Sequence, residues 1–282
     1  MGNYQYVSRL WLDGNSKTYW KGNLWQGECA DSVSTNSSIL CKLDHPNIIK
    51  VYGLHENYKE TYFYQDLAIG GDLFSYLCNG TDTLHPIREP GALFIVFQVA
   101  MALEYIHSMG ITHRDLKLDN VLIKDVPSRY PHIVLADFGA AQESSFPKLS
   151  RPADRMYTMI GTAEYAAPEI KLGLDRSQKG YTNKVDIWSL GIIAHILLSG
   201  ISPFHDETTE KVFQKVQKAH IDLEIKQWRH ISVEAKLFVK GCLRPRVSQR
   251  FDIHDCMRSQ WINQKGRRKL LDNCYSAVVT NK

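Results

Sequence analysis

Four polar residues in the middle of the chain have side chains that could move a proton and hold a metal ion. Asp115 and Lys117 are two residues apart, Asn120 follows three residues later, and Asp137 lies 17 residues after Asn120. Carboxylate and amide oxygens are ligands that Mg²⁺ prefers, and a carboxylate can accept a proton from a hydroxyl group. The residue types therefore indicate acid–base chemistry beside a magnesium ion.

These residues belong to motifs that follow one another in a fixed order. The sequence reads H-R-D-L-K-L-D-N at residues 113–120, D-F-G at residues 137–139 and A-P-E at residues 167–169, whose glutamate lies 32 residues after the aspartate of D-F-G. In this order and spacing they resemble the catalytic loop, magnesium loop and activation segment of protein kinases. The resemblance implies an α+β fold with two lobes, a small β-containing N-terminal lobe and a large helical C-terminal lobe.

The resemblance gives the four polar residues separate roles in phosphoryl transfer, with ATP and Mg²⁺ as cofactors. Asp115 would orient the hydroxyl group of a protein substrate and accept its proton, and Lys117 would reach the γ-phosphate. Asn120 and Asp137 would hold the metal ion. Because Lys117 follows H-R-D and Thr162 lies in the activation segment, the resemblance implies serine/threonine specificity.

The same resemblance assigns a nucleotide site next to the hinge. The backbone of Asp66 and Ala68 would face the adenine ring, with Gln65 at the gatekeeper position and Leu122 on the apolar floor. Lys21 is the nearest candidate for the strand lysine that contacts the phosphates.

Regulation and substrate choice are assigned to further residues. Thr158 and Thr162 are candidate phosphorylation sites of the activation segment, and a phosphate on Thr158 would lie within reach of Arg114. Asp72 and Asp119 resemble positions that bind an arginine three residues before the phosphoacceptor.

Three more residues are expected to support the structure. Glu169 would pair with a buried arginine, for which Arg250 is the best candidate. Asp186 would hold the backbone of the catalytic loop.

Hydrophobic periodicity agrees with two lobes. Alternating apolar residues predict strands at residues 48–51 and 61–65. Two apolar stretches, residues 92–103 and 187–198, are each about a dozen residues long, whereas a membrane span needs about 20. Both therefore predict helices buried in a soluble core, and no membrane association is expected.

Four segments are expected along the chain. They are a truncated or divergent N-terminal lobe (1–65), a hinge (66–71), a C-terminal lobe with the catalytic loop and activation segment (72–264), and a basic tail (265–282).

The N-terminal lobe departs from the kinase pattern. Residues 1–44 contain no G-x-G-x-x-G, and the position where a helix glutamate is expected falls near Asn36, which cannot form the ion pair with the strand lysine. A second interpretation is therefore a pseudokinase that acts as a binding or scaffold module. A third, a small-molecule kinase, is disfavoured by the activation segment.

Composition excludes some classes and names no partner. The 282 residues are 44% hydrophobic and 23% charged, which excludes disorder as the dominant state. A net charge of +4 is too small to indicate nucleic-acid binding, and none is predicted. The six cysteines lack metal-ligand spacing and no secretory signal is evident, so we expect reduced thiols in an intracellular protein.

The resemblance can be narrowed to the calmodulin-dependent/checkpoint-kinase group. H-P-N-I-I-K-V-Y at residues 45–52, G-G-D-L-F-S-Y-L at residues 70–77 and G-I-S-P-F at residues 200–204 carry it. Together with Gln65 these segments look most like the meiosis-specific kinases of budding yeasts. That likeness implies a role in meiotic recombination checkpoint signalling and a nuclear location. The forkhead-associated domain of those kinases is expected to have no counterpart in this sequence.

Overall fold

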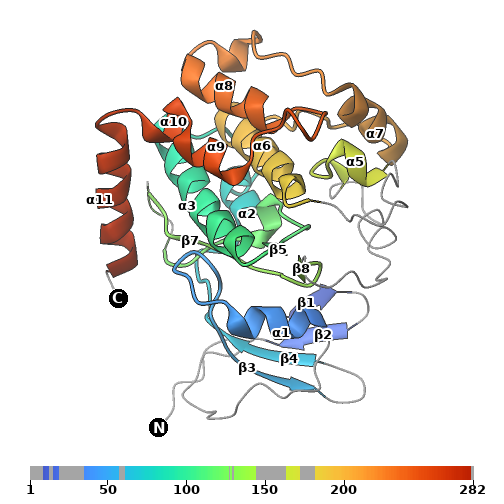
Figure 1. Ribbon diagram of the computed structural model, residues 1–282, viewed down its shortest axis with the longest axis vertical. Coiled ribbons are helices and arrows are strands. Elements are labelled where there is room, and N and C mark those ends of the chain that lie inside the picture. Colours follow the sequence, from blue (N-terminus) through green and yellow to red (C-terminus); the bar gives the residue numbers. More distant parts are fainter. Residues whose placement is uncertain are drawn as a thin grey trace.

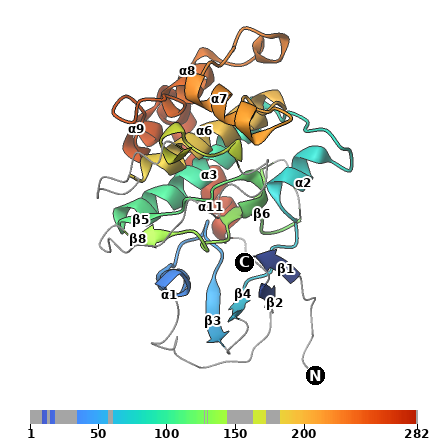
Figure 2. The same ribbon diagram turned by 90° about the vertical axis from the view of Figure 1, so that its right-hand side faces the viewer.

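A computed structural model describes residues 9–12, 15–18, 35–56, 61–126, 128, 130–143, 163–171 and 182–280. The described chain forms a small lobe of strands with one helix and a large lobe of helices (Figures 1 and 2). This arrangement confirms the two-lobed α+β fold predicted from the sequence.

The small lobe holds two antiparallel hairpins and one helix. Its elements are β1 (Arg9–Leu12), β2 (Asn15–Thr18), α1 (Thr35–Lys42), β3 (Val51–Glu56) and β4 (Thr61–Gln65). Strand β1 pairs with β2, strand β3 pairs with β4, and β2 lies against β4. Helix α1 packs on β3 through apolar residues such as Ile39, which is buried.

The large lobe is built around two helices that are apolar on nearly every side. These are α3 (Glu89–Ser108) and α6 (Lys184–Ser199), which contact each other. Helix α3 is long and apolar enough to cross a membrane by length and composition alone. Its middle is, however, buried inside the protein against α6 and α9 (Ile253–Arg258), as in the core helix of a globular domain.

Shorter elements surround these two helices. They are α2 (Leu73–Cys78), β5 (Ile111–Thr112), a 3₁₀ turn (Leu118–Asn120), β6 (Val121–Ile123), β7 (Ile133–Leu135), β8 (Gln142–Glu143), α5 (Pro168–Lys171), α7 (Thr209–Lys218), a second 3₁₀ turn (Lys226–Trp228), α8 (Val233–Cys242) and α10 (Gln260–Asn263). Strand β5 pairs with β8, and β6 pairs with β7, in both cases antiparallel.

A loop between α1 and β3 joins the small lobe to the large one at Asn47. This side chain is fully buried, and its Nδ2 donates to Gln98 Oε1 at 3.1 Å and to the carbonyl of Ile133 at 2.8 Å. The backbone of the loop also bonds to β7, because Leu135 N donates to the Asn47 carbonyl at 2.8 Å. The loop is thereby fixed to the core of the large lobe.

The residues expected to form a basic tail make a helix that packs on the protein. Helix α11 (Arg267–Thr280) buries Leu271 and contacts α3. The guanidinium of Arg268 lies over the ring of Phe97, 5.0 Å from its centroid. The hydroxyl of Tyr275 donates to Asn47 Oδ1 at 2.8 Å. Apolar residues at helical spacing thus attach α11 to the large lobe, although its charges had suggested a basic tail.

The cysteines agree only in part with the expectation of reduced thiols. Cys78, Cys242, Cys256 and Cys274 are free thiols. Cys41 is disulfide-bonded. The expectation of a fully reduced chain was therefore wrong at Cys41.

A buried ion pair fastens the end of the activation segment to the helical core. Arg250 NH1 and NH2 donate to Glu169 Oε1 and Oε2 at 2.7 and 2.8 Å, and the Arg250 side chain has no exposed surface. Its Nε donates to the carbonyl of Arg244 at 2.9 Å, and the guanidinium lies over the ring of Trp188. The two nitrogens of the guanidinium bind the two oxygens of one carboxylate, and a lysine cannot form this paired hydrogen bond.

We predict that Arg250→Ala lowers the free energy of unfolding by about 3–5 kcal/mol, because it leaves the Glu169 carboxylate without its buried partner. Arg250→Lys should recover only part of this loss. Urea denaturation measures the effect, with the exposed Arg246→Ala as the control. A loss below about 1 kcal/mol for Arg250→Ala would contradict the role given to this pair.

Candidate active site

The catalytic loop follows β5 and is held by a carboxylate from α6. The backbone N–H groups of His113 and Arg114 donate to Asp186 Oδ2 and Oδ1 at 2.9 and 2.8 Å. The ring of His107 lies 2.9 Å from Oδ2 through Nε2. Asp186 is fully buried and lies in the first turn of α6, two residues after its first residue, Lys184.

The electrostatics of Asp186 show why it stays charged in the core. Burial works to raise the pKa of its carboxyl. The hydrogen bond and charge of His107, with the charge of His113 and the N–H of Arg114, outweigh burial and lower the pKa. The carboxylate can therefore hold Arg114 at a φ of 70°, a left-handed conformation that costs a non-glycine residue about 1–3 kcal/mol.

Three of the predicted catalytic side chains contact one another. Asp115 Oδ2 lies 3.3 Å from Lys117 Nζ and accepts a hydrogen bond from Asn120 Nδ2 at 3.1 Å. The same Nδ2 donates to the Asp115 carbonyl at 2.7 Å. Burial raises the pKa of Asp115, while the charge of Lys117 works against the rise. A carboxylate with a raised pKa is a better proton acceptor than a solvated one.

Asp137 reaches the same site through the pairing of β6 with β7. Val121 lies opposite Leu135, and the N–H of Ala136 donates to the carbonyl of Asn120 at 2.9 Å. Asp137 follows Ala136 directly and takes a φ of 57°. Its Oδ1 accepts from the N–H of Gly139 at 3.1 Å.

The donor set of Asn120 and Asp137 fits a magnesium ion. Because Asn120 uses its Nδ2 on Asp115, its Oδ1 is left with no hydrogen bond to any described residue. Asp137 Oδ2 likewise has no hydrogen-bond partner in the described part of the chain. Two hard oxygens are thus available beside the predicted base, and Mg²⁺ is commonly bound by one or two such groups together with water and phosphate.

The hinge presents backbone groups that the fold does not use. The N–H of Asp66 donates to the carbonyl of Lys50 at 2.9 Å. In contrast, the carbonyl of Asp66 and the N–H of Ala68 have no backbone partner among the described residues. Gln65 is buried at the end of β4, and Leu122 is the one residue of β6 that is not fully buried. This arrangement suits a planar ring with one donor and one acceptor.

The side chain of Asp66 is held away from these backbone groups. Tyr52 donates its hydroxyl to Asp66 Oδ1 at 2.7 Å, and Lys124 Nζ lies 3.3 Å from Oδ2. The hydrogen bond to Asp66, with some burial, raises the pKa of Tyr52 to about 12.

The two residues predicted to bind an arginine differ in their surroundings. Asp72 caps α2, and its two carboxylate oxygens accept from the N–H and the hydroxyl of Ser75, each at 2.8 Å. Asp119 is exposed and makes no hydrogen bond or ion pair with a described residue. Only Asp119 therefore offers an unengaged carboxylate.

Several predicted site residues are not placed. Lys21, Thr158 and Thr162 lie outside the described residues. Arg114, expected near phosphorylated Thr158, donates from NH1 to Gln142 Oε1. Asn36 lies within α1, where the missing glutamate was expected.

A lysine that the sequence reasoning missed lies on a strand. Lys17 belongs to β2, which packs against β4, the strand that leads into the hinge. The segment N-S-K-T has no apolar alternation, so periodicity gave no reason to place a strand there.

Comparison with known proteins decides the family. Residues 18–262 match the family model described as the protein kinase domain. The chain belongs to the protein kinase family.

Three relatives place the chain within the family. It is 43% identical over 238 residues to the meiosis-specific serine/threonine-protein kinase MEK1 of Saccharomyces cerevisiae, which covers 79% of this chain and 46% of the relative. It is 37% identical to the MEK1 kinase of Schizosaccharomyces pombe, covering 82% of this chain and 49% of the relative. It is 33% identical to a calcium/calmodulin-dependent protein kinase type 1 of Macrobrachium nipponense, covering 88% and 66%.

These two yeast relatives are serine/threonine-protein kinases, the class predicted from the sequence. The chain spans about half the length of the two yeast kinases it matches.

The kinase motifs are joined by contacts that the sequence did not reveal. The ring of His113 lies 4.6 Å from that of Phe138, and its Nε2 is 3.1 Å from the carbonyl of Ala136. His107 reaches Asp186 across 79 positions of sequence. His113 belongs to the H-R-D motif itself, but no local sequence pattern predicts the contacts that either histidine makes.

We predict that Asp186→Asn lowers the free energy of unfolding of the kinase by about 1.5–3 kcal/mol at neutral pH, because hydrogen bonds to a charged group are lost. A lowered pKa gives stability above the unfolded-state value near 3.9 and loses it as pH falls through the folded-state value. The difference between parent and variant should therefore shrink below about pH 4.

Urea denaturation at a series of pH values measures this difference. Asp82→Asn, an exposed carboxylate outside the site, is the matched control. A difference that stays constant from neutral to acid pH would show that the charge of Asp186 contributes nothing.

Proposed function

We propose that the chain is an ATP- and Mg²⁺-dependent kinase that phosphorylates serine or threonine in protein substrates. The observation that carries the proposal is the contact of Asp115 with both Lys117 and Asn120, next to one oxygen each of Asn120 and Asp137 that no described residue engages. This is the arrangement that phosphoryl transfer needs, since that reaction depends on positioning and charge neutralisation.

Each residue has a defined task in this proposal. Asp115 accepts the proton of the substrate hydroxyl, for which its raised pKa suits it. Lys117 keeps the carboxylate oriented and offsets negative charge at the reacting phosphate. Asn120 and Asp137 hold the metal ion, which when bound neutralises phosphate charge. The backbone groups of Asp66 and Ala68 that have no backbone partner among the described residues orient the adenine.

We predict that Asp115→Asn abolishes phosphotransfer and leaves the thermal midpoint unchanged or slightly raised. The raised pKa means that burial disfavours the charged form, so a neutral isostere removes no folding energy. Transfer of labelled phosphate from ATP to a generic protein substrate, with a parallel thermal melt, measures both effects. Retention of most of the activity would refute the role of Asp115.

A second candidate function is a non-catalytic scaffold. Asn36 favours it, because this residue takes the place of the acidic partner within α1. The same phosphotransfer assay separates the two functions, since a scaffold would give equal background signal for the parent chain and for Asp115→Asn.

The proposed substrates carry an arginine three residues before the acceptor. The exposed carboxylate of Asp119, which no described residue engages, supports this preference, because a guanidinium can form charge-assisted hydrogen bonds with it. Asp72 would contribute its negative charge while Ser75 occupies its oxygens.

We predict that Asp119→Ala lowers the preference for arginine by about 10- to 100-fold, the loss of one charge-assisted interaction. The effect of Asp72→Ala should be smaller, because its carboxylate already caps α2. A degenerate peptide array gives both values, with Asp82→Ala as the control. An arginine preference that survives the double variant would rule out these two residues.

We further propose a nuclear role in meiotic recombination signalling, which rests on the likeness to the two yeast kinases. The test is a chimera in which this chain replaces the matching segment of the Saccharomyces cerevisiae relative.

We predict that the chimera restores the parental ratio of inter-homologue to inter-sister recombination and locates to the nucleus. The chimera with Asp115→Asn should still locate to the nucleus but should not restore the recombination ratio. Equal recombination with both chimeras would contradict a catalytic role in meiosis.

A further inference from the structure

The C-terminal helix α11 lies beyond the segment that matches the kinase family, yet it packs on the core of the large lobe. The family match ends at residue 262, whereas α11 spans Arg267–Thr280. In Figure 1, α11 runs beside α3 towards the small lobe. Leu271 is buried, and the ring of Tyr275 meets that of Phe97 edge-on, with 5.9 Å between the centroids. The helix is therefore part of the folded unit, although the family pattern does not include it.

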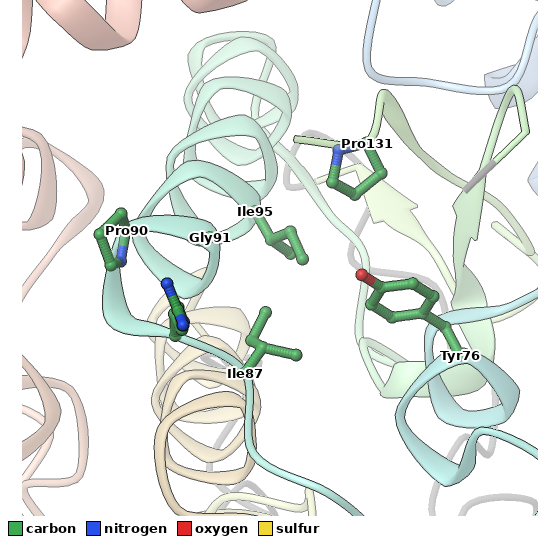
Figure 3. Close-up of a pocket in the computed structure, with 7 residues that line it drawn as sticks. Tyr76, Ile87, Pro90, Gly91, Ile95 and Pro131 are labelled. Atoms are coloured by element: carbon green, nitrogen blue, oxygen red, sulfur yellow. The ribbon is translucent and has the colours of Figure 1, made fainter. Parts of the chain in front are cut away.

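The hydroxyl of Tyr275 completes the hydrogen bonds of a buried amide. It donates to Asn47 Oδ1 at 2.8 Å, and Asn47 has no exposed surface. Asn47 Nδ2 is engaged by Gln98 and by the carbonyl of Ile133. Gln98 in turn donates to the carbonyl of Pro131, which lines a pocket at the other end of this network (Figure 3). Without the hydroxyl, Asn47 Oδ1 would be a buried acceptor with no partner in the described part of the chain.

The backbone around Asn47 runs beside β7, the strand whose end leads to Asp137. Leu135 N donates to the carbonyl of Asn47 at 2.8 Å, and Ile49 N donates to the carbonyl of Leu135 at 2.9 Å. On its other side β7 pairs with β6, which directly follows Asn120. Asp137 comes two residues after Leu135. The loop that contains Asn47 therefore holds the strand on which the positions of both candidate metal ligands depend.

We propose that Tyr275 is a positioning residue for the magnesium site and that α11 is for this reason part of the working kinase. The hydroxyl holds Asn47, Asn47 holds the end of β7, and β7 sets the position of Asp137. Burial raises the pKa of Tyr275, which keeps the hydroxyl protonated and able to donate. The proposal rests on the metal role proposed for Asp137, whereas the attachment of α11 does not.

The test compares ATP binding by the full chain in excess Mg²⁺ and in EDTA, measured by calorimetry below the thermal midpoint. The ratio of the two affinities is the gain that the metal ion gives. Tyr275→Phe removes only the hydroxyl, and we expect it to reduce this gain by about 3- to 10-fold, which corresponds to one hydrogen bond. The affinity for ATP in EDTA should stay at the parent value.

Tyr105→Phe is the matched control. It removes a tyrosine hydroxyl that accepts from Asp44 N at 3.1 Å, in the same loop and three residues before Asn47. Because Asp44 is exposed and this bond does not involve β7, the gain from Mg²⁺ should stay at the parent value.

A double variant tests the route from Tyr275 to the metal site. In an Asn47→Ala background, Tyr275→Phe should cause no further loss of the gain, because both changes break the same path. Should Asn47→Ala fail to fold, hydrogen exchange takes its place. The amide of Leu135 should exchange about 3- to 10-fold faster in Tyr275→Phe than in the parent, while the amide of Ile192 in the middle of α6 keeps its rate.

The outcomes separate this proposal from the kinase function itself. A gain that disappears with Asp137→Ala but is unchanged in Tyr275→Phe would overturn the proposal and leave the metal role of Asp137 standing. A gain that survives Asp137→Ala would refute that metal role and the proposal with it. If Tyr275→Phe lowered the affinity by the same factor with and without Mg²⁺, α11 would serve stability alone and the proposal would be wrong.

Discussion

The carboxylate of Asp186 has no exposed surface, and a buried charge is stable only when its oxygens are fully hydrogen-bonded. Here the donors are the ring of His107 and the backbone N–H groups of His113 and Arg114. Because two of these donors belong to the catalytic loop, satisfying the charge fixes the loop. The conformation of Arg114, which is costly by itself, follows from the same requirement.

Once the catalytic loop is fixed, contacts between residues near each other in the sequence and the pairing of two short strands position the other residues of the site. The fixed loop turns the Asp115 side chain towards Lys117 and Asn120. The 3₁₀ turn that carries Asn120 leads directly into β6, and the pairing of β6 with β7 brings Asp137 alongside. The predicted catalytic groups of two loops therefore meet, because one buried charge fixes the first loop and the pairing of β6 with β7 places the second.

The sequence allowed the family and the two-lobed fold to be predicted, because the chemistry of phosphoryl transfer demands particular residue types at fixed spacing. It revealed less where a contact depends on distant residues. His107 and Asp186 lie 79 positions apart, and no periodicity connects them. The packing of α11 was not predicted, because the segment begins with basic residues and the spacing of Leu271 and Tyr275 alone is a weak sign of a helix that packs on the core. The kinase resemblance assigned Asp72 to arginine binding, and the structure shows that its carboxylate also caps α2 through Ser75.

The bond between Tyr275 and Asn47 also bears on the order in which the protein matures on the ribosome. The two residues are separated by 228 positions. At about 5–20 residues per second, synthesis places Tyr275 in the chain roughly 10–50 s after Asn47. During that interval the loop between the lobes lacks one of its side-chain hydrogen bonds, so the attachment of this loop is completed only after α11 has been synthesised.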